Sequence, residues 1–162
     1  MKHIKIWSLL AMAVVAMTSC GGGSDDNDTP NPPAGGGVTV EKLAGEWHLT
    51  LFDSNKQGGD VYISFAADGT FELYQLAYNA GYDRYTGRFS LENGSVLTGV
   101  YSDNTPWATS YACSIDAAGT TLILTGQNSD GIISYYTKSA IPDDVKNSII
   151  TKAAATDQTR WL

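Results

Sequence analysis

Eight short stretches rich in β-branched and aromatic residues follow one another between residues 45 and 139, and this regular spacing most limits the possible folds. Turn-forming pairs separate several of them, such as Asp68-Gly69, Asn93-Gly94 and Asp130-Gly131, because these residues tolerate positive φ. Regular short strands joined by tight turns favour an antiparallel sandwich or barrel over a parallel α/β sheet. The predicted strands span 45–53, 60–67, 69–77, 84–91, 95–102, 109–116, 120–127 and 131–139.

Apolar and polar residues alternate within most of these stretches, which is typical of strands with one buried face. In the first stretch, Trp47, Leu49 and Leu51 share one parity, and His48 lies on the other. An eight-stranded barrel is filled by its own side chains or holds one small ligand. The bulky members of the predicted inward set favour a narrow or partly filled cup, and they are Trp47, Phe65, Phe71, Phe89 and Tyr111.

A single helix is predicted after the last strand. Pro142 is a favoured first helical residue, and we expect the helix to fray near Thr156. An apolar stripe at helical spacing predicts that the helix docks on the sheet, and it consists of Ile141, Val145, Ile149 and Ile150. The sequence leaves two options for the segment 160–162, which either tucks back onto the barrel or frays.

The N-terminal segment 1–19 has the features of a signal peptide. Lys2 and Lys5 precede an apolar run of twelve residues, which is shorter than the roughly 20 residues that a membrane-spanning helix needs. The sequence Met17-Thr18-Ser19-Cys20 resembles the cleavage site of bacterial lipoproteins. The resemblance implies cleavage before Cys20 and attachment of acyl chains, such as palmitate, to its sulfur. The alternative is an ordinary secretory signal followed by an incidental cysteine.

Residues 20–39 are predicted to be a disordered tether that begins with the lipidated Cys20. The segment is rich in Gly, Pro and Asp and has no apolar periodicity. Its acidic cluster at 24–28 resembles the export signal of surface-displayed lipoproteins in some Gram-negative bacteria. The resemblance implies a lipid anchor in the outer membrane with the domain facing the cell exterior. The periplasmic face, or a merely solvated linker, is the alternative.

A family resemblance enters with the motif Leu43-x-Gly45-x-Trp47 just before and within the first strand. This spacing resembles the opening motif of lipocalins, in which the Trp closes one end of an eight-stranded up-and-down barrel. The chain is therefore similar to bacterial lipocalin-like lipoproteins. The resemblance implies an all-β barrel with a C-terminal α-helix in 40–162, structural roles for Gly45 and Trp47, and a small apolar ligand. Many lipocalins place an Arg over this Trp, whereas the last predicted strand here carries Lys138.

Charge and residue types exclude several functions. The formal net charge of −7 argues against nucleic acid, since phosphate contacts need clustered Lys and Arg. No nucleophile triad or zinc signature is present, and His48 has no Cys or acid partner at ligand spacing. Cys113 is predicted to be a lone buried thiol. We therefore expect no enzymatic activity, no metal and no cofactor.

Aromatic residues supply the candidate ligand contacts. Alternate loops of an up-and-down barrel share one end, so Tyr78, Tyr82 and Trp107 are predicted to gather at the mouth. Phe71, Phe89 and Tyr111 are predicted to line the upper cavity for a small hydrophobic or amphipathic ligand. The alternative is an interaction module that uses the aromatic rim to hold a glycan or a protein of an outer-membrane complex. A third interpretation is that the tyrosines simply cover exposed β-surface.

Overall fold

The computed structural model describes residues 37–53, 59–76, 81–149 and 160–162. It contains eight strands, followed by the predicted helix, so the all-β class and the strand count are confirmed, and a second short helix precedes the first strand. The elements are α1 (Val40–Leu43), β1 (Gly45–Phe52), β2 (Val61–Phe65), β3 (Thr70–Leu76), β4 (Tyr82–Glu92), β5 (Val96–Tyr101), β6 (Tyr111–Ile115), β7 (Thr121–Gly126), β8 (Ile133–Lys138) and α2 (Asp143–Asn147).

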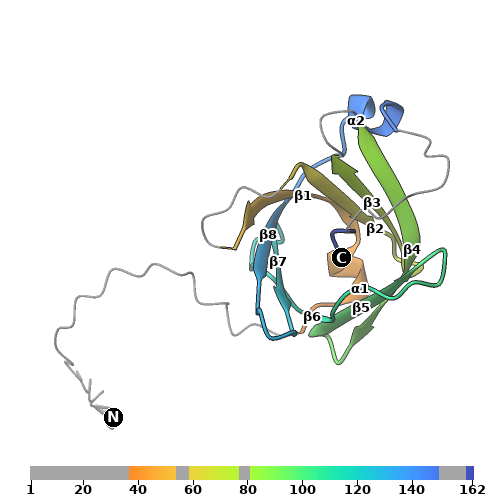
Figure 1. The fold of residues 1–162 in the computed structure, drawn as a ribbon. Helices are drawn as coiled ribbons and strands as arrows, with labels where there is room; N and C mark the ends of the chain where they lie inside the picture. The colour runs from red at the N-terminus through yellow and green to blue at the C-terminus, as the bar shows by residue number, and fades with distance from the viewer. Residues whose placement is uncertain (1–36, 54–58, 77–80, 150–159) are drawn as a thin grey trace, which may run out of the picture.

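The strands form a closed antiparallel barrel in which each strand pairs with its neighbours in sequence and β8 returns to β1. Figure 1 looks down this barrel, with the C-terminus in its centre. The tight turns follow the predicted chemistry, because Asn93 and Gly94 have φ of 51° and 64° and Gly69 has φ of 81°. The predicted architecture, an eight-stranded up-and-down barrel with a helix after its last strand, is confirmed.

A β-bulge in β1 corrects the predicted alternation. Leu49 lies opposite Tyr136, but Leu51 lies opposite Tyr135, so the register shifts between these two residues of β1. The extra residue turns Leu51 to the outside, where it is 38 % exposed. The prediction that Leu51 faces inward with Trp47 is therefore wrong, and Phe52 takes the inward direction instead.

The C-terminal helix is shorter than predicted. Pro142 is the N-cap of α2 and Ser148 is its C-cap, so the helix ends at Asn147 instead of extending towards Thr156. Ile149 is no longer helical, because its main chain pairs with Tyr82 in an isolated parallel bridge. Residues 150–159 lie outside the described part of the chain, and so does Ile150 of the predicted stripe.

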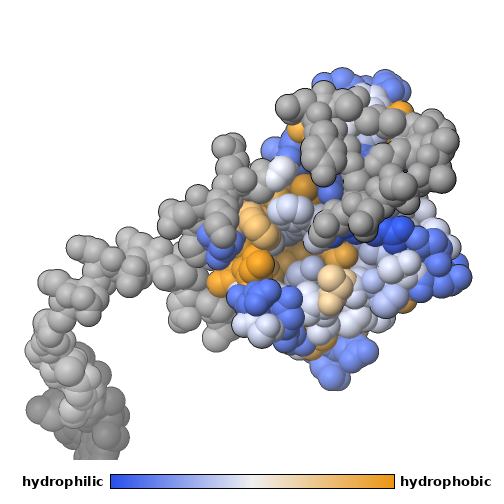
Figure 2. Space-filling view, viewed as in Figure 1, coloured by the Kyte–Doolittle hydropathy of each residue, from blue (hydrophilic) through white to orange (hydrophobic). Residues whose placement is uncertain are grey.

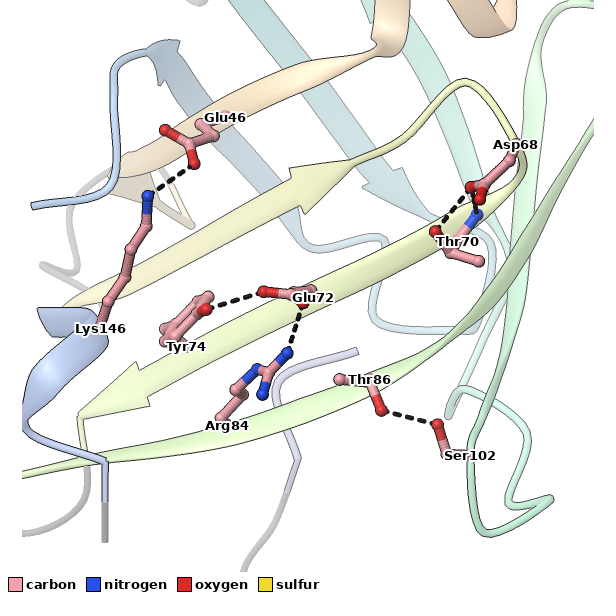
Figure 3. A network of polar contacts seen from close by, with 9 residues as sticks. All are labelled: Glu46, Asp68, Thr70, Glu72, Tyr74, Arg84, Thr86, Ser102 and Lys146. Carbon is pink, nitrogen blue, oxygen red and sulfur yellow. Dashed lines mark hydrogen bonds and ion pairs between the residues drawn. The ribbon is translucent and has the colours of Figure 1, made fainter. Parts of the chain in front are cut away.

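The predicted docking of the helix is confirmed for two residues of its stripe. Ile141 and Val145 are buried against Tyr62 and Tyr74 on the outer faces of β2 and β3. The carboxylate of Glu46 fastens this end, because it accepts hydrogen bonds from the Ile141 N–H at 2.8 Å and from Lys146 Nζ at 3.0 Å. Figure 3 shows the Glu46–Lys146 pair beside further polar pairs, whose residues come from β3, β4, the turn before β3 and the segment after β5.

The folded part begins slightly earlier than predicted. Val38 is buried in the core, and its N–H donates to the Gly94 carbonyl at 2.7 Å. The Thr39 side chain caps α1 through the Lys42 N–H. Composition alone places both residues in the tether, because it carries no information about such long-range contacts. The signal segment 1–19, Cys20 and the tether up to residue 36 lie outside the described residues.

Candidate functional site

The closed end of the barrel is built around Trp47. Its indole is fully buried, and Nε1 donates a hydrogen bond of 2.8 Å to the Leu43 carbonyl of α1. Lys138 Nζ lies 5.3 Å from the ring centroid, so a lysine takes the place where the family resemblance implies an arginine. Gly45 has φ of 136°, and a Cβ there would approach Lys138 Cε to 3.1 Å. The glycine therefore leaves room for the cation over the indole.

Trp107 lies in the interior of the barrel, although it belongs to the segment between β5 and β6. Its ring rests on Gly99, where a Cβ would lie only 2.2 Å from Trp107 Cε2. The ring also meets Phe71 edge-on, with centroids 5.1 Å apart. Trp107 is 6 % exposed, and its indole N–H has no hydrogen-bond partner among the described residues. Gly99 thus creates the space that draws this residue into the core.

Tyrosines from four strands line the upper part of the barrel. Tyr85 of β4 and Tyr101 of β5 meet edge-on at 5.9 Å, and Tyr111 of β6 and Tyr136 of β8 also face the interior. Burial raises the pKa of Tyr101, Tyr111 and Tyr136. These phenols are therefore neutral at physiological pH and available as hydrogen-bond donors or acceptors inside the barrel.

The segment Arg160–Leu162 enters the barrel between these tyrosines, so the predicted option of tucking back is the one observed. Leu162 is 2 % exposed, and its main-chain oxygen accepts a hydrogen bond of 2.8 Å from the Tyr101 hydroxyl. The Trp161 N–H donates to Gln75 Oε1 at 3.0 Å, and its indole Nε1 donates to the Tyr136 hydroxyl at 2.9 Å. The segment is thus held by main-chain and side-chain contacts from three strands.

Arg160 lies at the edge of the same opening. Its guanidinium carbon lies 5.2 Å from the Tyr85 ring centroid and 4.5 Å from that of Tyr101. Both terminal nitrogens bind the Asp103 carboxylate, one of them at 3.1 Å. Hydrogen bonds from Arg160 and from the Thr105 N–H hold the pKa of Asp103 well below its usual 3.8. A cation is therefore well accommodated at this point of the rim.

A cavity of about 200 Å³ remains beside Trp161 at the same level. Phe52, which the bulge turns inward, meets the Trp161 ring at 4.7 Å and forms one side of it. Figure 2 shows hydrophobic residues towards the centre of this face and hydrophilic residues around its periphery. The other principal lining residues are Tyr111, Gly126, Asn128, Ile132, Ser134 and Tyr136.

A second polar cluster lies on the outer wall near α2. His48 Nε2 lies 2.7 Å from Asp60 Oδ1, and the His48 ring stacks on Tyr62 at 4.3 Å. The Tyr82 hydroxyl donates to the other oxygen of Asp60, and burial with this hydrogen bond raises the pKa of Tyr82. The outward direction of His48 agrees with the alternation. The expectation that it lacks an acidic partner is wrong, because the pairing of β1 with β2 brings Asp60, just before β2, next to His48.

The structure brings together some of the predicted ligand residues and separates others. Trp107 is in ring contact with both Phe71 and Tyr111, inside the barrel. Phe89 lies nearer the floor, where it meets Phe65 at 5.0 Å. Tyr82 is at the mouth end of β4, but its side chain packs on the outer wall with Tyr62. The predicted rim of Tyr82 and Trp107 is therefore not formed by these two side chains.

Tyr78 lies outside the described residues, so its predicted place at the mouth stays a prediction. The upper barrel also contains residues that are not among the predicted ligand contacts: Phe52, Tyr85, Tyr101, Tyr136 and the segment 160–162. Alternation carries a signal for three of these, since each tyrosine has the inward parity of its strand. The inward direction of Phe52 could not be predicted without the bulge in β1. The segment 160–162 has no local pattern that predicts a place inside a barrel.

Across residues 37–53, 59–76, 81–149 and 160–162, no three His, Cys, Asp or Glu side chains gather in a way that could hold a metal ion. In the same part of the chain, no helix has the length and apolar character needed to cross a membrane.

Comparisons with known proteins give a likeness to solved structures. No family model and no curated protein matches the sequence. Among solved structures, the crystal structure of a lipocalin-like protein from Bacteroides uniformis ATCC 8492 is similar over 60 % of this chain and 99 % of that chain. The two are 22 % identical, with a TM-score of 0.47.

Proposed function

We propose that this chain is a non-enzymatic lipoprotein of the cell envelope whose barrel binds a small hydrophobic or amphipathic ligand at its mouth. One observation carries the proposal. Aromatic side chains line the upper barrel, and Trp107 and the segment 160–162, which belong to no strand, fill much of it. A cavity of about 200 Å³ nevertheless remains beside Trp161. An engineered cavity of ~150 Å³ takes benzene, so this space has room for one ring.

The lining suggests how a ligand is held. Tyr111 and Phe52 offer ring faces and edges to an apolar group, and the neutral phenol of Tyr136 offers a hydrogen bond. Ligand sites of this kind are mostly apolar with a few polar groups that orient the guest. The buried N–H of Trp107, which lacks a partner among the described residues, is a further donor next to Tyr111.

The alternative of a glycan- or protein-binding aromatic rim has less support. Such a rim needs exposed rings on neighbouring loops, but Trp107 is 6 % exposed and Tyr82 packs on the outer wall. An open cup that includes Tyr111 fits the geometry of the described residues better. Of the ligand contacts predicted from the sequence, we retain Tyr111, which lines the cavity, while Trp107 packs against Tyr111 and Phe71 packs against Trp107.

The non-enzymatic part of the proposal rests on the fold and on the outer cluster. The interior of an eight-stranded barrel is filled by its own side chains or holds one small ligand. The His48–Asp60–Tyr82 cluster resembles catalytic sites in residue types, but the raised pKa of Tyr82 disfavours a nucleophilic phenolate. The cluster instead joins β1, β4 and the segment before β2, which is a structural role.

The ligand site is tested with the fluorescent apolar probe N-phenyl-1-naphthylamine. We expect saturable binding, and we expect Ser134→Phe to weaken it at least about tenfold by filling the cavity. Ile133→Phe adds the same ring to the outer face of the same strand, and it is expected to leave binding unchanged. Saturable binding that Ser134→Phe leaves intact would place the probe elsewhere and contradict the proposal.

The anchor is tested separately in cells. Metabolic labelling with palmitate is expected to label the chain and to fail in Cys20→Ala, whereas Cys113→Ala keeps the label. Protease treatment of intact cells is expected to release the domain if it faces the exterior. Absence of label would contradict the proposed lipid anchor. Release of the domain only after the outer membrane is opened would favour the periplasmic face.

A further inference from the structure

We propose that the barrel mouth is a peptide-binding site for a cationic, an aromatic and a branched aliphatic residue in succession, and that Arg160–Leu162 occupies it in cis and competes with such a peptide. The inference rests on the proposed function, because it names the ligand class of the same cup. It goes further in two respects: the guest is a peptide, and the chain carries its own competitor.

Contacts to the main chain are the first reason to infer a peptide. The side-chain oxygen of Gln75 accepts from the Trp161 N–H, and the Tyr101 hydroxyl donates to the Leu162 oxygen. These two groups come from β3 and β5 and point at a donor and an acceptor of neighbouring residues. They would serve any peptide in the same pose, whatever its side chains.

The side-chain positions give the preference for an aromatic residue followed by an aliphatic one. The Trp161 indole lies against Phe52 and donates to the Tyr136 hydroxyl, which is fully buried. Leu162 belongs to the main hydrophobic core, where it is 2 % exposed. The cup therefore accepts a ring with an N–H donor and, deeper, a branched aliphatic group.

Charge favours a cation at the third position. The barrel presents the Asp103 carboxylate and the ring faces of Tyr85 and Tyr101 to the Arg160 guanidinium. With the segment displaced, an anionic ligand such as a fatty acid would meet the Asp103 charge, whereas a guanidinium would regain the carboxylate and both rings. The mouth thus selects cationic over anionic amphipathic guests.

The fit of the segment explains how it yields to a competitor. Trp161 borders the cavity of about 200 Å³, so the internal occupant leaves space beside its ring unfilled. Arg160 is bound at the rim, where the Asp103 side chain is 49 % exposed and water competes for the ion pair. An occupant in the same chain still has the advantage of a high effective concentration.

The experiment measures a fluorescein-labelled Arg-Trp-Leu peptide by anisotropy with two forms of the otherwise complete chain, with and without residues 160–162. We expect the form without 160–162 to bind the peptide at least about tenfold more tightly than the full chain. Asp103→Asn in the shortened form is expected to weaken Arg-Trp-Leu and to leave the matched Gln-Trp-Leu peptide unaffected. Tyr101→Phe is expected to weaken both peptides.

Circular dichroism shows whether the shortened chain folds. If it does not, Trp161→Ala in the full chain vacates the indole position, and the same peptides are titrated against it. Absence of peptide binding to a folded, vacated form overturns the inference, and so does binding that ignores both Asp103 and Tyr101. Titration with N-phenyl-1-naphthylamine separates the two proposals. A vacated form that binds this probe but no peptide would support the apolar ligand site and contradict the peptide-binding site.

Discussion

The hydroxyl of Tyr101 donates a hydrogen bond of 2.8 Å to the main-chain oxygen of Leu162, across a sequence separation of 61 residues. Both residues are almost fully buried, so each polar atom depends on the other for its hydrogen bond inside the barrel. The contact makes the closing segment part of the core and ties the occupancy of the cup to the stability of the fold.

Tyr101→Phe is therefore expected to lower the free energy of unfolding by about 1–3 kcal/mol, because it leaves the buried Leu162 oxygen without its donor. Urea unfolding followed by fluorescence measures the change. Tyr135→Phe removes the same atom from a tyrosine that faces away from the barrel interior, and it is the control. Equal stability of the two variants would show that the hydrogen bond contributes little.

Gly99→Ala tests the insertion of Trp107. A Cβ at residue 99 would lie 2.2 Å from Trp107 Cε2, so the indole has to move. We expect a loss of about 1–3 kcal/mol in the free energy of unfolding, as for other overpacked cores. Gly59→Ala is the matched control, since a Cβ there meets nothing within 4 Å. A Gly99→Ala variant as stable as this control would contradict the observed packing.

The Arg160–Asp103 pair predicts a pH dependence. The pKa of Asp103 is lowered in the folded state, so its contribution to stability is present above the usual 3.8 and is lost as pH falls through the lowered pKa. The melting temperature of the wild type is expected to exceed that of Asp103→Asn at about pH 7. The difference between the two melting temperatures is expected to shrink towards about pH 2. A difference that does not depend on pH would mean that the ionised carboxylate is not responsible.

Cys113 is expected to be chemically inert in the native protein. Burial raises the pKa of its thiol to about 12, and the residue is 6 % exposed. Alkylation by iodoacetamide at about pH 8 should therefore be slow in the folded state and fast in urea, where the thiol regains its ordinary reactivity. Cys113→Ser controls for labelling elsewhere. Rapid labelling of the folded protein would show that this part of the wall opens readily.

Lys138→Met tests the floor of the barrel. The ammonium of Lys138 lies over the Trp47 ring, and its loss is expected to cost about 0.5–1 kcal/mol in the free energy of unfolding. Lys138→Arg keeps a cation over the indole and is expected to retain the stability, which denaturant titration measures. If Lys138→Met unfolds at the same midpoint as Lys138→Arg, the charge over the ring has no role.

Much of the barrel is predictable because its determinants are local. Alternation places Phe71 and Tyr111 on the inner face, and the Asn93-Gly94 pair predicts a tight turn that the positive φ values confirm. In both cases the relevant physics acts between residues a few positions apart, through the two-residue period of a strand or the backbone freedom of a turn. The closing role of Trp47 is instead what the resemblance of its motif to that of lipocalins implies.

The errors have a common origin in contacts that local patterns do not encode. The bulge before Leu51 reverses the expected faces, and it is visible only in the pairing of β1 with β8. Trp107 was expected at the rim, but the gap over Gly99 draws it into the core. The Tyr82 side chain lies on the outer wall, where it contacts Asp60, just before β2, and Tyr62 of β2.

The sequence by itself determined the number of strands, most of their inward faces and the aromatic character of the barrel interior, since strand period and turn preference are properties of short segments. Only the tertiary structure decided what fills the mouth. Trp161 binds Gln75, which is 86 positions away in the sequence, and Tyr136, which is 25 positions away. These two contacts form together only when the sheet has closed into a barrel. The closed barrel brings Gln75, Tyr101 and Tyr136 to one opening, where they bind the segment 160–162.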